Sequence, residues 1–244
     1  MSDSFTDKMT FVQRLGNIAM TIFEAVYMNI FYYPQQNEIY KASFPDPKPS
    51  FDDAMKNVNL VLLNSHFTLS YPRPFVPNMI EVGGLHINRV PNPLPKDIKD
   101  FLDNAKDGVV YFSMGSNIQS TTMPAEKSDA LLKTFGKLKQ KVMWKWENDK
   151  LPGKPDNVFI KSWWPQDDIL AHPNVKVFIT HGGLLGSTEA IYHGVPVIGI
   201  PIFGDQELNM ARAQRAGYGL TVNYRNLTED ALSWALNEVL GDTK

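Results

Sequence analysis

The sequence contains no cysteine among its 244 residues, which excludes disulfides, cysteine-ligated zinc, iron–sulfur clusters and thiol nucleophiles. It also has no excess of charge of one sign. Its 24 basic side chains face 26 acidic ones, without a dense Lys/Arg run, so we expect no nucleic-acid partner. No stretch approaches the ~20 consecutive apolar residues of a transmembrane helix. The polar start, Met1–Lys8, does not resemble a signal peptide.

What the chain does have is the composition of a soluble globular protein, with 43% apolar residues and a length that allows one or two domains. Apolar side chains spaced by three and four residues predict an amphipathic helix over Thr10–Ile30. A segment rich in proline and aromatics follows. Two short apolar runs, Val58–Leu63 and Met79–Val82, are typical of buried strands. The three prolines of Asn88–Lys96 indicate an extended linker, so we divide the chain into residues 1–90 and 91–244.

The second part alternates apolar, strand-like runs with helical patterns, which predicts an α/β fold with a doubly wound parallel sheet covered on both faces. Asp205 stands where it can cap a helix, and Gly217 stands where that helix should end. The expected strands are Val109–Ser113, Val142–Trp146, Val158–Lys161, Val175–Thr180, Val195–Ile200 and Leu220–Asn223, and the expected helices Ala125–Leu138, Gly183–His193, Asp205–Ala216 and Thr228–Leu240.

Ligands of open parallel sheets bind outside the carboxyl ends of the strands, which directs attention to the loops that follow them. The loop Ser113–Asn117 is small enough for its backbone amides to approach an anion, or it is an ordinary turn. The loop Ser162–Gln166 contains adjacent tryptophans. One of their indoles can stack on a planar base beside Gln166, which can both donate and accept hydrogen bonds; alternatively both indoles pack against helices.

The two later loops favour a phosphate and a sugar. In Thr180–Glu189, paired glycines open a helix where its amides and positive dipole favour phosphate, with His181 beside them. Glu189 lies two turns on and can accept from vicinal hydroxyls, although a lone histidine or glutamate is more often structural. In Pro201–Gln206, Asp205 and Gln206 can read sugar hydroxyls, unless Asp205 serves only as a cap. The order of the loops matches a nucleotide-sugar.

The runs Trp163-Trp-Pro-Gln166 and Phe178-Ile-Thr-His-Gly-Gly through Phe203-Gly-Asp-Gln206 resemble the signature of UDP-glycosyltransferases, with Leu184-Leu185 similar to the invertebrate branch. Similarity continues in Phe112–Ser116 and Val82–His86. The resemblance implies a GT-B fold, with a C-terminal Rossmann-like domain and a partial N-terminal Rossmann-like domain. It also implies inverting transfer of a hexosyl group from UDP-glucose or UDP-glucuronate to a small lipophilic hydroxyl acceptor, with no metal and no cofactor besides the donor.

Carried over by position, the family's donor contacts fall on residues of these loops. Trp163 and Gln166 would contact uracil, and Glu189 the ribose. The diphosphate would meet His181 and the amides of the glycine turn, and the sugar would meet Asp205 and Gln206. The implied UDP-sugar-binding residues are therefore Ser116, Trp163, Gln166, His181, Gly182, Gly183, Gly186, Glu189, Asp205 and Gln206.

The sequence departs from the family in its first 90 residues, which resemble only the final portion of an acceptor-binding domain. The family's general base is a histidine near the start of that domain, and no histidine here occupies its position, so we assign no catalytic residue. The family's signal and C-terminal membrane anchor are also missing, which indicates an internal piece of such an enzyme. The resemblance implies the lumenal side of the endoplasmic reticulum membrane and a role in detoxification. The alternative is an inactive UDP-binding fragment. Asn226-Leu-Thr228 fits the N-glycosylation pattern, which also arises by chance.

Overall fold

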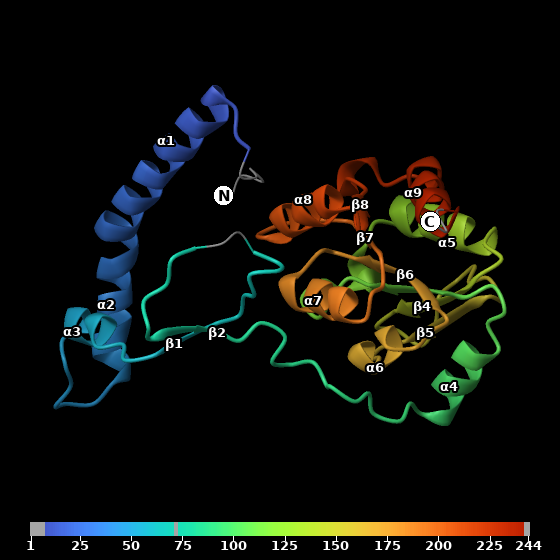
Figure 1. The fold of residues 1–244 in the computed structure, drawn as a ribbon, viewed down its shortest axis with the longest axis horizontal. Helices are drawn as coiled ribbons and strands as arrows, with labels where there is room; N and C mark the ends of the chain where they lie inside the picture. Colours follow the sequence, from blue (N-terminus) through green and yellow to red (C-terminus); the bar gives the residue numbers. More distant parts are fainter. Residues whose placement is uncertain (1–7, 71–72, 242–244) are drawn as a thin grey trace. The chain divides into compact units, whose positions relative to one another are not determined.

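The computed structural model describes residues 8–70 and 73–241, which divide into two compact units at Gly83–Gly84. We call residues 8–83 the N-terminal unit and residues 84–241 the sheet unit (Figure 1). Each is described by itself below.

The N-terminal unit begins with a long helical stretch. Helix α1, Phe11–Tyr27, starts with a capping box in which Thr10 and Gln13 exchange side-chain-to-backbone hydrogen bonds, and it confirms the predicted helix. A π-helical turn, Met28–Tyr32, leads into α2, Tyr33–Ser43, which the proline-rich sequence did not predict. Pro34 follows directly after the π-helical turn, in which the Tyr33 N–H bonds the carbonyl of Met28, so the proline stands where the helical hydrogen-bonding pattern changes.

The rest of the N-terminal unit is helix α3, Phe51–Lys56, and the parallel strands β1, Val61–Leu63, and β2, Met79–Glu81. Both strands exist as predicted, but the expectation that they are buried is wrong. Their residues alternate between half-buried and exposed, because no helix is packed over both faces of this pair in the described part of the unit.

The sheet unit contains a fully parallel sheet of six strands in the order β5-β4-β3-β6-β7-β8 within residues 84–241. The chain starts in the middle, at β3, runs outward to β5, returns to β6 and runs outward to β8. This order has its switch point between β3 and β6, which confirms the predicted doubly wound Rossmann-like fold. The strands are β3 Val109–Ser113, β4 Lys141–Lys145, β5 Val158–Lys161, β6 Val175–Thr180, β7 Val197–Gly199 and β8 Gly219–Thr221.

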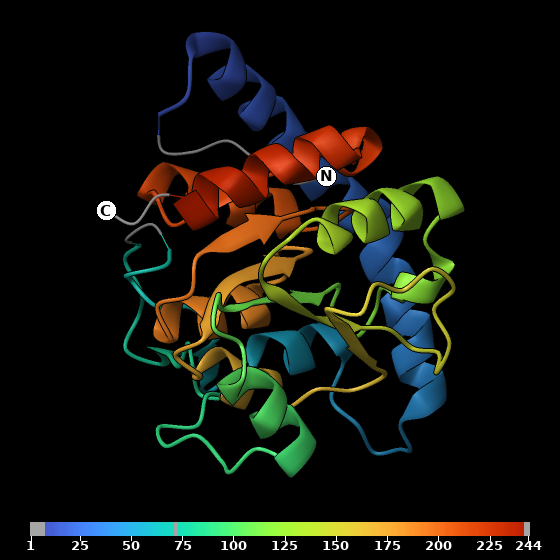
Figure 2. The ribbon, with the colours of Figure 1, turned by 90° about the vertical axis from the view of Figure 1, so that its right-hand side faces the viewer.

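Helices cover both faces of the sheet (Figure 2). On one face, Val110 and Phe112 of β3 pack with α5 and α9. On the other, their neighbours Val109 and Tyr111 pack with α4, α6, α7 and α8, as the two-residue period of a strand requires. The helices are α4 Lys96–Asp103, α5 Ala125–Gly136, α6 Gln166–Leu170, α7 Leu184–Tyr192, α8 Gln206–Ala216 and α9 Glu229–Gly241, with short 3₁₀ turns at Ser120–Thr122 and Tyr224–Asn226.

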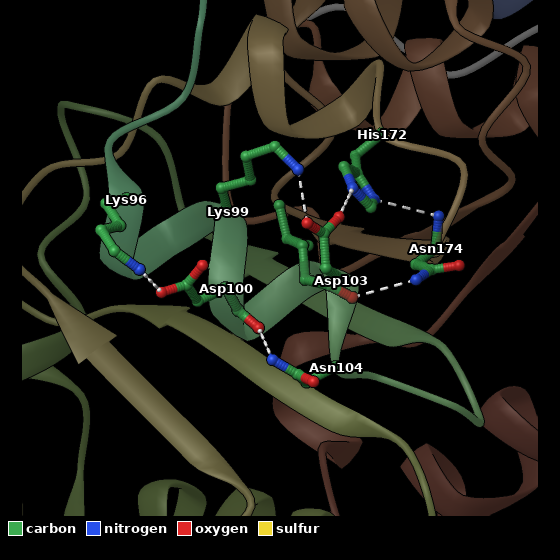
Figure 3. Close-up of polar contacts among 8 residues, drawn as sticks. Lys96, Lys99, Asp100, Asp103, Asn104, His172 and Asn174 are labelled. Carbon is green, nitrogen blue, oxygen red and sulfur yellow. Dashed lines mark hydrogen bonds and ion pairs between the residues drawn. The ribbon is translucent and has the colours of Figure 1, made fainter.

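A network of polar side chains fastens α4 to the start of β6 (Figure 3). Nδ1 of His172 accepts from the backbone of Asn174 at 3.2 Å, which leaves Nε2 to donate to Asp103 at 3.1 Å. Asn174 in turn donates to the carbonyl of Leu102 at 3.0 Å. Because these contacts lie at the amino end of β6, away from the loops that follow the strands, we assign His172 a structural role.

Candidate functional site

The predicted loops all follow strands of the one parallel sheet, so they meet at its carboxyl edge. Two of them flank the switch point: the loop after β3, which contains Gly115 and Ser116, and the loop after β6, which contains His181 and the paired glycines. The loops after β5 and β7 lie on either side. The fold thus gathers the predicted residues at the place where doubly wound sheets bind nucleotides.

His181 is packed between two glycines of the loops at the switch point. A Cβ on Gly115 would lie 2.5 Å from Cε1 of the imidazole, and one on Gly183 would lie 2.5 Å from Nε2. Both distances are too short for any side chain. Glycine at these positions therefore lets the ring sit against the backbone of both loops, with its Nδ1 buried and without a partner in the described residues.

Burial lowers the pKa of His181, and the nearby cation Lys145 lowers it further while Asp205 acts against both. The imidazole is therefore held neutral at physiological pH. A neutral imidazole carries one N–H, so His181 can donate a single hydrogen bond to an anion and supplies no full positive charge.

Positive charge comes instead from Lys145, which the sequence analysis did not single out. It is the last residue of β4 and only 8% exposed. Its ammonium donates to the carbonyl of Gly115 at 2.7 Å, lies 3.5 Å from Glu147, and lies 6.0 Å from the centre of the Trp163 ring. A cation at the end of a strand would have been found by extending the carboxyl-edge rule from the loops to the strand ends themselves.

Trp163 and Trp164 differ completely in exposure. Trp163 is 69% exposed, whereas Trp164 is 2% exposed and packs edge-on against Phe159. Of the two alternatives, one indole open to a ligand or both indoles packed against helices, the exposures agree with the first. Trp163 is consequently the ring that is open to a ligand.

Gln166 and Glu189 are joined by a hydrogen bond of 2.5 Å from the amide Nε2 to the carboxylate. The hydroxyl of Tyr111 donates to the other end of the Gln166 amide at 3.2 Å. Gly186 leaves room for this amide, because a Cβ there would lie 3.1 Å from Nε2. Burial raises the pKa of Glu189, while the bond from Gln166 opposes the rise. The amide oxygen of Gln166 can still accept one further hydrogen bond, and its NH₂ group can still donate one, so both are available to a ligand.

Asp205 and Gln206 are held by contacts within their own region. The carboxylate of Asp205 accepts from Asn209 at 2.9 Å and makes no capping bond to the α8 backbone, so the expected side-chain cap is absent. Asn209 also donates to the carbonyl of Gly182 at 3.0 Å, which ties this loop to the glycine turn. The side-chain oxygen of Gln206 accepts from the backbone of Ile202 and Phe203, so this oxygen shapes its loop and the amide N–H groups are left to donate.

Ser116 is exposed in the loop after β3, and its side chain makes no hydrogen bond within the described residues. A cavity of about 590 Å³ opens farther along the same edge, beside α8 and the turn after β8. It is lined by Pro201 and Ile202 of the fourth loop but by none of the predicted binding residues. Within residues 8–70 and 73–241 no cluster of acidic side chains or histidines has the geometry of a metal site, and no helix is long and apolar enough to cross a membrane.

Comparison with known proteins identifies the family. The family model "UDP-glucoronosyl and UDP-glucosyl transferase" matches residues 1–244. The chain is 44% identical over 243 residues to UDP-glycosyltransferase UGT5 of Dactylopius coccus and 36% identical to rabbit (Oryctolagus cuniculus) UDP-glucuronosyltransferase 2C1, covering 46% and 47% of those proteins. It thus spans about half the length of these relatives.

Solved structures agree on the fold. A crystal structure of the kitacinnamycin glycosyltransferase aligns with 95% of this chain and 59% of its own, with a TM-score of 0.67 at 18% identity. A UDP-glucose: anthocyanidin 3-O-glucosyltransferase in complex with UDP aligns with 82% of this chain and 50% of its own, with a TM-score of 0.63 at 20% identity. These neighbours are GT-B glycosyltransferases, and the chain belongs to the family of UDP-glucuronosyl and UDP-glucosyl transferases.

Proposed function

We propose that the sheet unit binds the UDP-sugar donor of a glycosyltransferase. The observation that carries this proposal is the cluster at the switch point, where backbone amides of the glycine turn, a neutral imidazole and the Lys145 ammonium lie side by side. Such a group of donors suits a diphosphate, and it is rigid because each member is fixed by its neighbours.

The remaining roles follow from what each side chain offers. Trp163, with its exposed indole, stacks on uracil, and Gln166 bonds the edge of the base. Glu189 accepts from the ribose hydroxyls. Asp205 and the amide of Gln206 hold hydroxyls of the sugar. Ser116 and Gly186 complete the phosphate and base ends of the site.

In the reaction, the glycosidic oxygen of the donor leaves with the diphosphate, on which negative charge grows. The Gly182 N–H already donates to Thr180 Oγ1 at 3.3 Å and fixes the glycine turn. The Gly183 amide with His181 and Lys145 stabilises the charge, which lowers the barrier without any metal. A hydroxyl of a small lipophilic acceptor attacks from the opposite face of the sugar, giving inversion, and loses its proton to a general base.

We propose that none of the chain's five histidines is that base. His172 and His193 pair with Asp103 and Asp167, and His181 is packed into the phosphate end. His86 faces Glu189 at 3.4 Å, and His66 bonds Thr68 at 2.7 Å and has no carboxylate partner within residues 8–70 and 73–241. This assignment favours the second candidate function, a UDP-binding chain that does not catalyse transfer by itself.

Calorimetry with UDP, run beside a turnover assay with a phenolic acceptor and either UDP-glucose or UDP-glucuronate, tests both candidates. We expect UDP to bind. The Asp205→Ala substitution should lower the affinity for the UDP-sugar more than the affinity for UDP itself. Turnover by the chain alone would refute the binding-only candidate. If UDP produces no binding heat, both candidates are wrong. The relative affinities for UDP-glucose and UDP-glucuronate, measured in the same calorimeter, decide between the two donors whether or not the chain turns over.

For location we propose the endoplasmic reticulum membrane, as the family resemblance implies, in a pathway of detoxification. Fractionation of cells that express the complete gene product, with a protease-protection assay for the lumenal side, tests the location. Recovery in the cytosolic fraction would contradict it.

A further inference from the structure

A segment ahead of the sheet folds back onto the helices that carry the site. We call residues 84–92 the strap. It begins in a turn at Gly84, whose φ of 83° is open to glycine, with the N–H of Ile87 donating to the Gly84 carbonyl at 3.0 Å. The prolines that follow keep the chain extended.

The strap is fastened to α6 at two points. The backbone N–H of Asn88 donates to Asp167 at 2.9 Å, and that of Asn92 donates to Asp168 at 2.6 Å. The other oxygen of Asp167 meets Nε2 of His193, the residue that ends α7, at 2.6 Å. The strap, α6 and α7 are therefore linked through one carboxylate.

These attachments bring His86 to Glu189. Nε2 of His86 lies 3.4 Å from one carboxylate oxygen of Glu189, whose other oxygen accepts from Gln166. The Glu189 side chain is 12% exposed and that of His86 28%, so the contact is shielded from water without being sealed. The sequence interpretation placed His86 with residues 1–90, but its contacts group it with the sheet unit.

We propose that His86 is a positioning residue, which holds the Glu189 carboxylate in the orientation that accepts from the ribose hydroxyls of a UDP-sugar. The proposal rests on the proposed function, and it makes the strap part of the nucleotide site. Held from one side by Gln166 and from the other by His86, the carboxylate loses its rotational freedom and keeps lone pairs on both oxygens for the ribose.

Charge strengthens this arrangement. Glu189 is faced by His86 from the strap, by Asp167 from α6, by His193 at the end of its own helix and by Tyr111 of β3. Burial raises the pKa of Glu189, Asp167 raises it further, and the two histidines lower it. Loss of His86 therefore moves the pKa of Glu189 upward, so protonation weakens the ribose contact at a higher pH.

Calorimetric titration of the full chain with UDP and with 2′,3′-dideoxy-UDP tests the proposal, because only UDP carries the vicinal hydroxyls. We expect His86→Ala to weaken UDP binding by about two- to five-fold, because Nε2 lies 3.4 Å from the carboxylate in an ion-pair contact that is longer than a good hydrogen bond, and to leave binding of the dideoxy compound unchanged. The acid-side loss of UDP affinity should begin at a higher pH than in wild type. His86→Gln, which still donates an N–H, should restore affinity near neutral pH.

His172→Ala is the matched control, since it also removes a histidine paired with a carboxylate, and it should bind both ligands as wild type does. Equal loss of UDP and dideoxy-UDP in His86→Ala would show a merely structural role and overturn the proposal, as would wild-type affinity in that variant. If wild type itself binds no UDP, the proposed function fails and this inference with it. If wild type binds UDP but does not prefer it to the dideoxy compound, only the ribose assignment of Glu189 fails and His86 loses its role.

Discussion

The two units of this chain differ in whether their apolar side chains are buried. In the sheet unit, strands such as β3 are fully buried between two layers of helices. In the N-terminal unit, no described residue of 8–83 is fully buried, and the apolar side of α1 remains open, with Phe11 78% and Phe23 62% exposed. Periodicity in the sequence thus predicts which face of a helix is apolar. Whether that face is covered depends on what packs against it.

The largest expected effect separates the cores of the two units. Phe135→Ala removes a fully buried ring that contacts Phe112 and Trp144, and should lower the free energy of unfolding by ~3–5 kcal/mol. Phe23→Ala removes an exposed ring and should change it by less than about 0.5 kcal/mol. Urea denaturation measures this with two probes: tryptophan fluorescence reports the sheet unit, in which all five tryptophans lie, and far-UV circular dichroism also reports the helices of the N-terminal unit. Equal losses in the two variants would contradict the comparison.

The next effect concerns histidines of the two units. His181→Ala removes the imidazole packed between Gly115 and Gly183 and should weaken UDP by about ten-fold or more, the worth of a hydrogen bond to a charged group. His66→Ala in the N-terminal unit should leave the affinity unchanged. Calorimetry with UDP provides the measurement, and comparable affinity in wild type and His181→Ala would remove His181 from the site.

The two units can also be compared by replacing one glycine in each, Gly183 in the sheet unit and Gly16 in the N-terminal unit. Gly183 has an ordinary φ of −63°, so Gly183→Ala strains no backbone, but its Cβ would lie 2.5 Å from His181 and must displace the ring. We expect a loss of UDP affinity of about ten-fold or less, since one hydrogen bond is distorted. Gly16→Ala meets nothing within 4 Å and should only favour α1, by up to ~1 kcal/mol. A Gly183→Ala variant that binds UDP normally would show that the ring position does not matter.

The smallest expected effect is at Glu189, where one substitution should raise the stability of the chain and lower its affinity for UDP. Burial raises the pKa of Glu189, so the folded state disfavours the charged form that prevails at neutral pH. Glu189→Gln should therefore stabilise the chain by less than about 1 kcal/mol at pH 7, while weakening UDP. The stabilisation should vanish below about pH 4, where the carboxyl is protonated in both states. Thermal denaturation of both proteins at pH 7 and below about pH 4 measures this stabilisation. Greater stabilisation at the lower pH would contradict the expected direction.

Much of the sheet unit could be predicted from sequence because its strands are continuous apolar runs; the bounds expected for β3, β5 and β6 are those observed. Helix α6 was missed because five residues carry no periodicity, and α2 because Pro34 normally discourages a helix. Within the site, the adjacent tryptophans alone left open whether one indole is exposed or both are packed, and only the family resemblance singled out Trp163. The structure exposes Trp163 and packs Trp164 against Phe159.

Lys145 and His86 were not predicted as site residues, because the sequence interpretation considered only the loops that follow the strands of the sheet. Each enters the site through contacts across the sheet or across the strap, with Gly115 and Glu189 respectively. His86 ends the family-like run Val82–His86 and Lys145 ends a strand, but neither pattern indicates which atoms the side chain contacts. The ten predicted binding residues keep their roles as a proposal, and the fold places them along one edge.

Hydrogen exchange of the full chain with and without UDP tests the central claim most directly, because it measures both units in one experiment. We predict slower exchange in the loops 113–117, 162–166, 180–186 and 201–206, and unchanged exchange over the described residues of 8–83. Protection in the N-terminal unit without protection of the loops beside His181 would contradict the claim that the sheet unit holds the nucleotide.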